Sequence, residues 1–271
     1  MTHYTLEFGG GLGDIFDQLY YRGAYNILRD LESQDTANVL LVTHNPHAKE
    51  LFEWHPKRMQ FEVQALGYWL VEDDTRIRAE RGLPPAGSNG FLPVRDSVIE
   101  YHPNPEDRKL LKKHVQGKRC IVLSPGAGTQ DRTIPWELLR EEIIPRLLEV
   151  ADRFQLVAVG RNYDRHGRTE YDFSEVPGVL DLTDQLSVPG TAWLVARASG
   201  LLTSHSALNL LGWNERVPQL LLYPQNVLDR HCPNGKYDQW MRGANRSDTV
   251  HCLFSEYTPE HMTQFIRNLR P

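Results

Sequence analysis

The chain has 271 residues, enough for one large domain or for two domains of roughly 110–150 residues, each with its own core. Its 24% of charged residues, 40% of apolar residues and net charge of −5 are ordinary for a globular protein and argue against a general nucleic-acid-binding protein. Three scattered cysteines exclude a disulfide framework. Without an apolar leader or a membrane-length apolar run, we expect a cytoplasmic protein.

The first predicted elements surround a run of glycines. An apolar strand over residues 4–8 leads into four glycines within five residues: Gly9, Gly10, Gly11 and Gly13. Apolar residues at helical spacing follow over 15–31, with Asp14 on the first helical turn and Asp17 one turn later. Glycines there permit positive φ and the close approach of another molecule. The spacing fits neither the dinucleotide fingerprint nor a P-loop, so this turn presents an acid.

The first half then continues as alternating strands and helices. We expect a strand over 39–43, a helix over 47–54, a strand over 59–63, a loop over 82–90 and a charged helix within 103–114. Gln116, Gly117 and Lys118 interrupt that helix, and we place the domain boundary there.

The second half begins the same pattern again. We expect strands over 120–124, 156–159, 179–182, 201–203 and 219–223, a long helix over 136–154 bent at Pro145, and helices over 191–198 and 207–213. Such alternation predicts a parallel sheet covered on both faces. The chain is therefore expected to be α/β, with two Rossmann-like domains (1–116 and 117–257) facing each other across a cleft. A terminal helix within 258–271 is expected to pack back on the N-terminal domain.

Ligands of such sheets bind outside the carboxyl ends of the strands. The loop after 120–124 carries Gly126, Gly128, Thr129 and Arg132. Backbone N–H groups, a hydroxyl and a guanidinium could hold a phosphate there. The alternative is a polar connection with a solvated arginine.

Two more strand ends carry candidate anion ligands. His205 and Ser206 precede a helix start, whose free N–H groups favour an anion. The alternative is a capping serine beside a solvent-facing histidine. Gly160 and Arg161 follow the strand at 156–159 and could face a nucleotide or solvent.

Metal and hydrolase signatures are missing from the sequence. His231-Cys232 and His251-Cys252 are adjacent pairs, and on a strand each pair offers one ligand per face. There is no Asp-x-Asp clamp and no Gly-x-Ser-x-Gly elbow. We expect no metal and no cofactor.

Several segments occur in an order and spacing that resemble one family. They are Gly13-Asp14-Ile15 with its apolar helix, Ser124-Pro125-Gly126-Ala127-Gly128 with Trp136, Val179-Leu180-Asp181-Leu182-Thr183, Leu201 to Ala207, and Val217-Pro218 to Pro224. Together they resemble the glycosyltransferase family 9 heptosyltransferases, which are two-domain enzymes of the GT-B fold that use ADP-heptose. Residues 33–117 add little to the resemblance.

The resemblance implies roles for individual residues. Asp14 would be the catalytic base, with Gly11, Gly13 and Asp17 on the acceptor side. The donor would be held by Gly126, Gly128, Thr129, Arg132, Gly160, Arg161, His205 and Ser206. The sequence departs from the family at several positions: His205 replaces an aspartate, Ala207 a glycine and Leu210 a histidine, and the family's phosphate-binding lysine is at best replaced by Arg132.

The function implied is inverting, metal-independent transfer of a sugar from a nucleoside-diphosphate donor to a hydroxyl of a carbohydrate or other acceptor. Three alternatives stay open. They are a GT-B nucleotide-sugar epimerase, a non-catalytic nucleotide-sugar binding protein, and a transferase acting on modified phage DNA bases. The acidic charge balance disfavours the last, so nucleic acid is expected only as a modified-base acceptor.

Overall fold

The computed structural model describes residues 3–8, 12–19, 38–43, 50–51, 60–65, 101–161, 171–231 and 248–271. The chain divides into two compact units, Met1–His102 and Pro103–Pro271.

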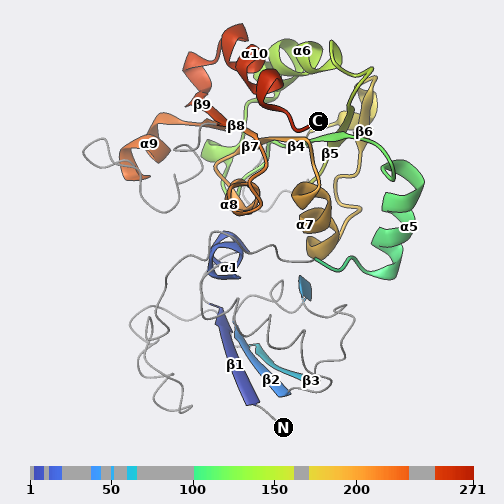
Figure 1. Ribbon diagram of the computed structural model, residues 1–271. Helices are drawn as coiled ribbons and strands as arrows, with labels where there is room; N and C mark the ends of the chain where they lie inside the picture. Colours follow the sequence, from blue (N-terminus) through green and yellow to red (C-terminus); the bar gives the residue numbers. More distant parts are fainter. Residues whose placement is uncertain are drawn as a thin grey trace. The chain divides into compact units, whose positions relative to one another are not determined.

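The first unit contains a parallel sheet of strands β1 (His3–Phe8), β2 (Asn38–Thr43) and β3 (Gln60–Ala65), in the order β1-β2-β3 (Figure 1). Helix α1 (Leu12–Leu19) follows β1. Its Ile15 and Phe16 are fully buried, and Phe16 meets the Tyr101 ring edge-on with 6.2 Å between ring centroids. The three predicted strands are confirmed to within two residues. The predicted helix at 15–31 starts earlier, at Leu12, and its part beyond Leu19 lies outside the described residues, as does most of the helix expected at 47–54.

The second unit is built on six parallel strands in the order β6-β5-β4-β7-β8-β9. These strands are β4 (Cys120–Ser124), β5 (Gln155–Ala158), β6 (Val179–Asp181), β7 (Gly200–Ser204), β8 (Gln219–Tyr223) and β9 (Thr249–Leu253). From β4 the chain builds outward through β5 and β6, then returns to place β7 on the other side of β4. The strand order therefore reverses between β4 and β7, as in other doubly wound sheets.

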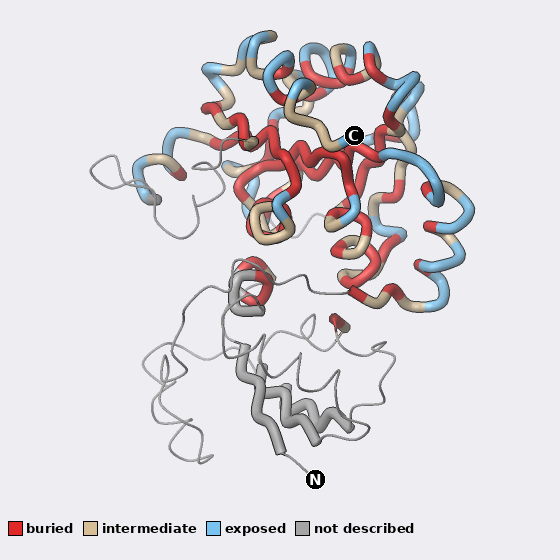
Figure 2. The backbone as a smooth tube through the Cα atoms, in the orientation of Figure 1, coloured by how far each residue is buried: buried red, intermediate tan, exposed pale blue. Residues whose placement is uncertain are grey.

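Helices and short turns connect these strands. They are α5 (Pro105–His114), η1 (Gln130–Arg132), η2 (Leu138–Ile143), α6 (Ile144–Leu148), η3 (Phe173–Glu175), α7 (Val188–Ala196), α8 (Ala207–Asn214), α9 (Gln225–His231), η6 (Phe254–Glu256) and α10 (Pro259–Asn268). In Figure 1, α6 and α10 lie on one face of the sheet and α7 and α8 on the other. Every residue of β4, β7 and β8 is buried, and Figure 2 shows these central strands as the buried layer of the unit. Burial on both faces explains why these strands read as continuous apolar runs.

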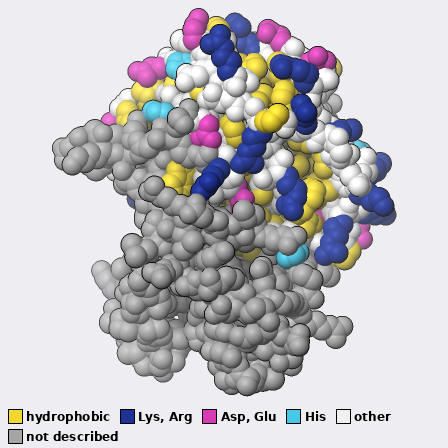
Figure 3. Space-filling model, viewed as in Figure 1, with side chains coloured by type: hydrophobic (Ala, Val, Ile, Leu, Met, Phe, Trp, Pro, Cys, Tyr) yellow, Lys and Arg dark blue, Asp and Glu magenta, His cyan; other side chains and the backbone are white. Residues whose placement is uncertain are grey.

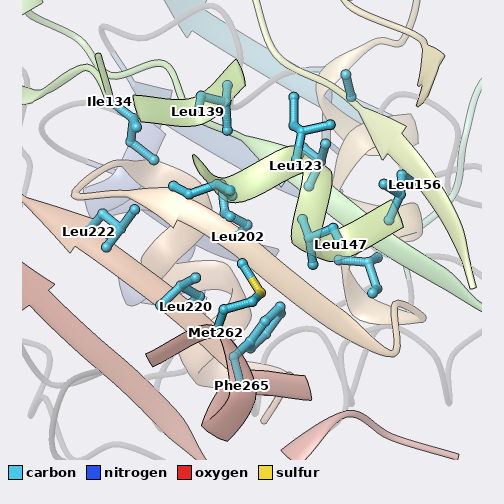
Figure 4. Packing of buried hydrophobic residues seen from close by; sticks show 14 of the residues in the cluster. Leu123, Ile134, Leu139, Leu147, Leu156, Leu202, Leu220, Leu222, Met262 and Phe265 are labelled. Carbon is cyan, nitrogen blue, oxygen red and sulfur yellow. The ribbon is translucent and has the colours of Figure 1, made fainter. Parts of the chain in front are cut away.

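The core of this unit forms where the sheet meets the first of these helical layers (Figure 4). Leu123, Leu202 and Leu220 from the strands pack in one cluster with Leu139 and with Phe265 of α10, all five fully buried. Burying one such side chain stabilises the fold by about 1.5–3 kcal/mol relative to leaving it exposed.

The long helix expected over 136–154 is wrong in its second half. η2 is a wide π-helical turn in which the Ile144 amide donates to Leu139 O, and the chain returns to α-helix at α6. Pro145 has no N–H to donate, and the wide turn before it accommodates that loss. α6 ends at Leu148, six residues before the predicted end of the helix at residue 154, and Ala151 beyond it is exposed.

The second unit begins earlier in the chain than the predicted boundary, and the helices at its two ends, α5 and α10, both pack within it. The carboxylate of Asp107 in α5 accepts hydrogen bonds from the Ser187 amide (3.0 Å) and hydroxyl, and it is only 2% exposed. These bonds tie α5 to the start of α7, so residues 103–116 pack with the second unit, whereas the predicted boundary placed them with the first domain. Helix α10 packs on β8 and β9 of the second unit through buried Met262 and Phe265, and its predicted contact with the N-terminal domain stays a prediction.

The outer surface of the second unit is charged. Figure 3 shows Lys and Arg side chains spread over the face that includes α5, where Lys109, Lys112 and Lys113 are exposed. Among the described residues, no helix combines the length and the apolar character needed to cross a membrane.

Candidate functional site

The carboxyl ends of β4 and β7 lie beside each other where the strand order reverses. Loops leaving adjacent strands at such a reversal diverge, and ligands of open α/β sheets bind in the crevice between them. Here the Ser204 hydroxyl, at the end of β7, donates to Gly126 O in the loop after β4 over 3.1 Å. The end of β7, directly before the anion site predicted at His205 and Ser206, therefore contacts the loop after β4.

The loop after β4, residues 125–134, is closed on itself. The Ile134 amide donates to Pro125 O (3.0 Å), and the Tyr171 hydroxyl lies 2.7 Å from Ile134 O and 3.3 Å from Pro125 O. Inside the loop, the Thr133 hydroxyl accepts from the Ala127 amide and donates to Thr129 O. A loop with this many internal bonds keeps its shape without a ligand, which is what preorganised binding requires.

The tip of this loop carries the predicted phosphate ligands. Arg132 Nε donates to the Thr129 hydroxyl over 2.9 Å, so the guanidinium and the hydroxyl are adjacent. A Cβ on Gly128 would lie 3.2 Å from Arg132 Nη2, so the glycine leaves space for the guanidinium. Asp131 Oδ2 accepts from Asn226 Nδ2 of α9 at 2.7 Å. Hydrogen bonds from Thr129 and Asn226 hold the pKa of Asp131 below its usual value.

The turn after β7 leads into α8, whose first residue is half-buried. Ser206 is the N-cap residue, but its hydroxyl lies 3.2 Å from the Thr203 hydroxyl and makes no capping bond to the helix. The first amides of α8 therefore donate no hydrogen bond to the hydroxyl of this serine, and the capping role considered for it is not observed. His205 is 2% exposed, so the alternative of a solvent-facing histidine is also wrong.

The end of β5 carries the third predicted pair. Gly160 has φ +120°, a conformation that favours glycine, and its added Cβ would lie 3.8 Å from the Ser124 hydroxyl. Arg161 Nη1 lies 4.0 Å from Asp184 Oδ1, and both side chains are nearly half exposed. Such exposed pairs contribute little to stability, so Arg161 can exchange this partner for another anion at small cost.

The predicted acceptor-side residues belong to the first unit. Gly13 is buried in α1, Asp14 is the third residue of that helix and Asp17 follows one turn later. Gly11 lies outside the described residues. The roles of these four residues stay predictions.

Three side chains that support the site were not predicted from the sequence: Ser204, Tyr171 and Asn226. Ser204 could have been noticed as a polar residue ending an apolar strand. Tyr171 and Asn226 contact the loop from distant parts of the sequence, and no local pattern marks them.

Metal ligands do not cluster in the described parts of the chain, where no three His, Cys, Asp or Glu side chains are grouped. Burial raises the pKa of the Cys120 thiol to about 11 and that of Cys252 to about 12, so both buried thiols stay protonated at neutral pH. Cys232 lies outside the described residues. The groups that the described site presents are hydroxyls, a guanidinium and helix amides, which are groups suited to an anionic ligand.

The α/β fold, with a six-stranded parallel sheet, is of the kind found in GT-B glycosyltransferases. It is similar to Escherichia coli ADP-heptose LPS heptosyltransferase II, with a TM-score of 0.59 and 11% identity over 98% of both chains. It is also similar to E. coli heptosyltransferase WaaC with ADP (TM-score 0.56, 13% identity, 98% of this chain and 99% of that one). A family 9 glycosyl transferase from Veillonella parvula gives a TM-score of 0.52 at 11% identity, over 99% of this chain and 90% of that one.

The fold similarity confirms the predicted resemblance to heptosyltransferases at the level of structure. No protein-family model matches the sequence, and a search of curated proteins finds no match either.

Proposed function

We propose that this protein is an inverting, metal-independent glycosyltransferase that moves a sugar from a nucleoside-diphosphate donor to an acceptor hydroxyl. The observation that carries the proposal is the contact between Ser204 at the end of β7 and Gly126, which joins two segments predicted to bind anions at the reversal point of a sheet. The whole chain shares its fold with heptosyltransferases, one of which, WaaC, is described with ADP. A nucleoside diphosphate is therefore the ligand class that fits best.

The leaving group of the proposed reaction is a diphosphate, whose oxygens gain negative charge as the bond to the sugar breaks. Fixed cations and dipoles that point at this charge lower the barrier. Arg132 and Thr129 supply a guanidinium and a hydroxyl side by side, and the uncapped start of α8 supplies backbone N–H groups. Gly126, Gly128 and Gly160 would let the diphosphate approach the backbone, while Arg161 and His205 complete the proposed donor side.

Asp14 is proposed as the general base. The acceptor oxygen attacks the anomeric carbon as the bond from that carbon to the diphosphate oxygen breaks, and the hydroxyl proton passes to the Asp14 carboxylate. Attack opposite the leaving group inverts the anomeric centre. A helix start makes a carboxylate a weaker base, so the proton would move late, after the attacking oxygen has become acidic.

This step requires the GT-B arrangement, in which the unit carrying Asp14 faces the unit carrying the donor. Gly11, Gly13 and Asp17 would then lie on the acceptor side, and the reaction would take place in the cytoplasm. A carbohydrate hydroxyl is the expected acceptor.

Thermal unfolding with ADP-, GDP-, UDP- and CMP-sugars tests the donor class. A donor at 100 times its Kd stabilises the folded state by about 2.7 kcal/mol, which raises Tm by several degrees. The free monosaccharides serve as controls and should leave Tm unchanged. If none of the nucleotide sugars raises Tm, the proposed function is contradicted.

The buried histidine at position 205 favours a second candidate, a nucleotide-sugar binding protein without turnover, because the family has an aspartate there. The donor found by thermal unfolding would be incubated alone and with a panel of sugar acceptors. Release of the nucleoside diphosphate only with an acceptor supports the transferase. Isomerisation of the donor alone would indicate an epimerase, and tight binding without any conversion would indicate the binding protein.

A further inference from the structure

Tyr171 lies at the base of the loop after β4, where the loop begins and where it ends. Its hydroxyl is 2.7 Å from Ile134 O and 3.3 Å from Pro125 O. These two residues are also joined by a hydrogen bond from the Ile134 amide to Pro125 O. One buried donor thus meets both ends of the loop. The residue is 6% exposed, so water does not replace this hydroxyl readily.

The aromatic ring of Tyr171 is fixed on several sides. It stacks on Phe173 with 5.8 Å between ring centroids and meets Trp136 edge-on at 5.6 Å. Its Cε2 atom would lie 3.9 Å from a Cβ on Gly126, so the ring also forms the wall behind that glycine. Burial raises the pKa of Tyr171, so its hydroxyl keeps its proton and stays a donor.

The direction of the Pro125 carbonyl decides where the next amide points. The C=O and N–H of one trans peptide point in opposite directions. With Pro125 O turned toward Tyr171 and Ile134, the Gly126 N–H faces away from the aromatic cluster, and no hydrogen bond among the described residues uses it. The Gly126 carbonyl is fixed in turn by Ser204. Both peptides that flank Gly126 are therefore oriented by a side chain.

We propose that Tyr171 is a positioning residue for the donor diphosphate: its hydroxyl sets the orientation of the Pro125–Gly126 peptide and so turns the Gly126 amide toward the phosphate. This inference rests on the proposed function. It adds that part of the donor's binding depends on a residue that does not touch the donor.

Tyr171→Phe removes the hydroxyl and keeps the ring, so it tests the proposal directly. The matched control is Tyr257→Phe, because Tyr257 also has a buried hydroxyl, and that hydroxyl has no hydrogen-bond partner in the described part of the chain. Binding of inorganic pyrophosphate and of ADP is measured by calorimetry well below Tm. We expect Tyr171→Phe to weaken both ligands about tenfold, the usual scale of one lost buried hydrogen bond. Tyr257→Phe should leave both affinities unchanged.

A purely structural role for Tyr171 gives a different result. Tyr171→Phe would then lower Tm while the affinity for pyrophosphate stayed at the wild-type value, and this outcome overturns the proposal. If the wild-type protein binds neither pyrophosphate nor any nucleotide, the proposed function fails together with this inference. If the wild type and Tyr171→Phe bind pyrophosphate and ADP equally well, this inference about Tyr171 fails while the proposed function stands.

A second measurement on the wild-type protein keeps the test valid if Tyr171→Phe does not fold. In an amide NMR titration with pyrophosphate, the Gly126 N–H signal should move to a position typical of a stronger hydrogen bond. A Gly126 signal that stays in place while pyrophosphate binds overturns the proposal.

Discussion

The turn after β1 and the loop after β4 both join a parallel strand to a helical segment through glycines, yet they present different chemistry. The first leads within a few residues into α1 and places one carboxylate, Asp14, on its first turn. The second is longer and closes on itself, and its tip carries Thr129 and Arg132 in contact with each other. A short turn suits a single group that moves a proton, and a long closed loop suits a ligand with several oxygens. In the proposed function, the same local design would serve acid–base chemistry in one unit and anion binding in the other.

Replacing the carboxylate of the first turn should have the largest effect. Asp14→Asn keeps the shape of the side chain but removes the base, so transfer to the acceptor should fall by about 10²–10⁴-fold. Donor affinity should stay unchanged, because the donor binds at the other unit in this proposal. Steady-state kinetics and calorimetry with the donor measure the two quantities.

The control for this variant is Asp152→Asn, an exposed carboxylate before β5 with 78% of its side chain accessible. It should transfer sugar at the wild-type rate. Turnover by Asp14→Asn at the wild-type rate would show that the turn after β1 does not supply the base. The turn after β1 and the loop after β4 could then no longer be contrasted as a proton acceptor and an anion site.

Replacing the cation of the second loop should have a smaller effect of a different kind. Arg132→Ala removes a guanidinium from a half-buried position, so donor affinity should fall about tenfold, the scale of one charge-assisted hydrogen bond to phosphate. This loss of affinity should be larger for the nucleoside diphosphate than for the nucleoside monophosphate, because the monophosphate has fewer phosphate oxygens that Arg132 could bind. Calorimetry with both nucleotides measures it.

Arg153→Ala is the matched control, because Arg153 is an exposed arginine just before the amino end of β5, whereas Arg132 follows the carboxyl end of β4. It should bind both nucleotides as the wild type does. Equal affinities for Arg132→Ala and the wild type would place Arg132 outside the donor site.

The second sheet was largely readable from the sequence, because buried parallel strands are uninterrupted apolar runs. β4 and β8 were predicted with both ends correct, and β5, β6 and β7 within a residue. β9 was missed, since the polar residues Thr249 and His251 leave no uninterrupted apolar run of strand length. The position of α10 could not be derived either, because an amphipathic pattern shows which face is buried but not which sheet buries it.

The parts of the candidate site that could be predicted from the sequence are those that residue type alone indicates. Glycines, hydroxyls and an arginine after a buried strand identified the loop after β4. Its supports were not readable: Tyr171 reaches Ile134 across 37 residues of sequence, and Asn226 reaches Asp131 across 95. Such partners are set by the strand order, and the order of six parallel strands is not contained in any local pattern.

The smallest effect on donor affinity is expected from a change at Asn226 of α9, which contacts the tip of the loop after β4. Asn226→Ala removes one of the hydrogen bonds that hold the pKa of Asp131 below its usual value, so this pKa should rise toward the ordinary value of an aspartate. Because the pKa is lowered in the folded state, the bond stabilises the tip at neutral pH. Its contribution is lost as the pH falls through the folded pKa of Asp131, so the stability difference between the wild type and Asn226→Ala should vanish in acid.

Carboxylate NMR titration of Asp131 measures the shift, and Gln225→Ala is the control, since Gln225 bonds to Asp229 in the same helix and should leave Asp131 unaffected. Donor affinity should change far less than in Tyr171→Phe, because Asp131 is exposed and its bond competes with water, whereas Tyr171 acts on buried carbonyls. A loss of affinity in Asn226→Ala as large as that in Tyr171→Phe would mean that the tip, and not the base, sets the shape of the loop. The loop after β4 would then differ from the short turn after β1 because α9 holds its tip through Asn226, and not because the loop closes on itself.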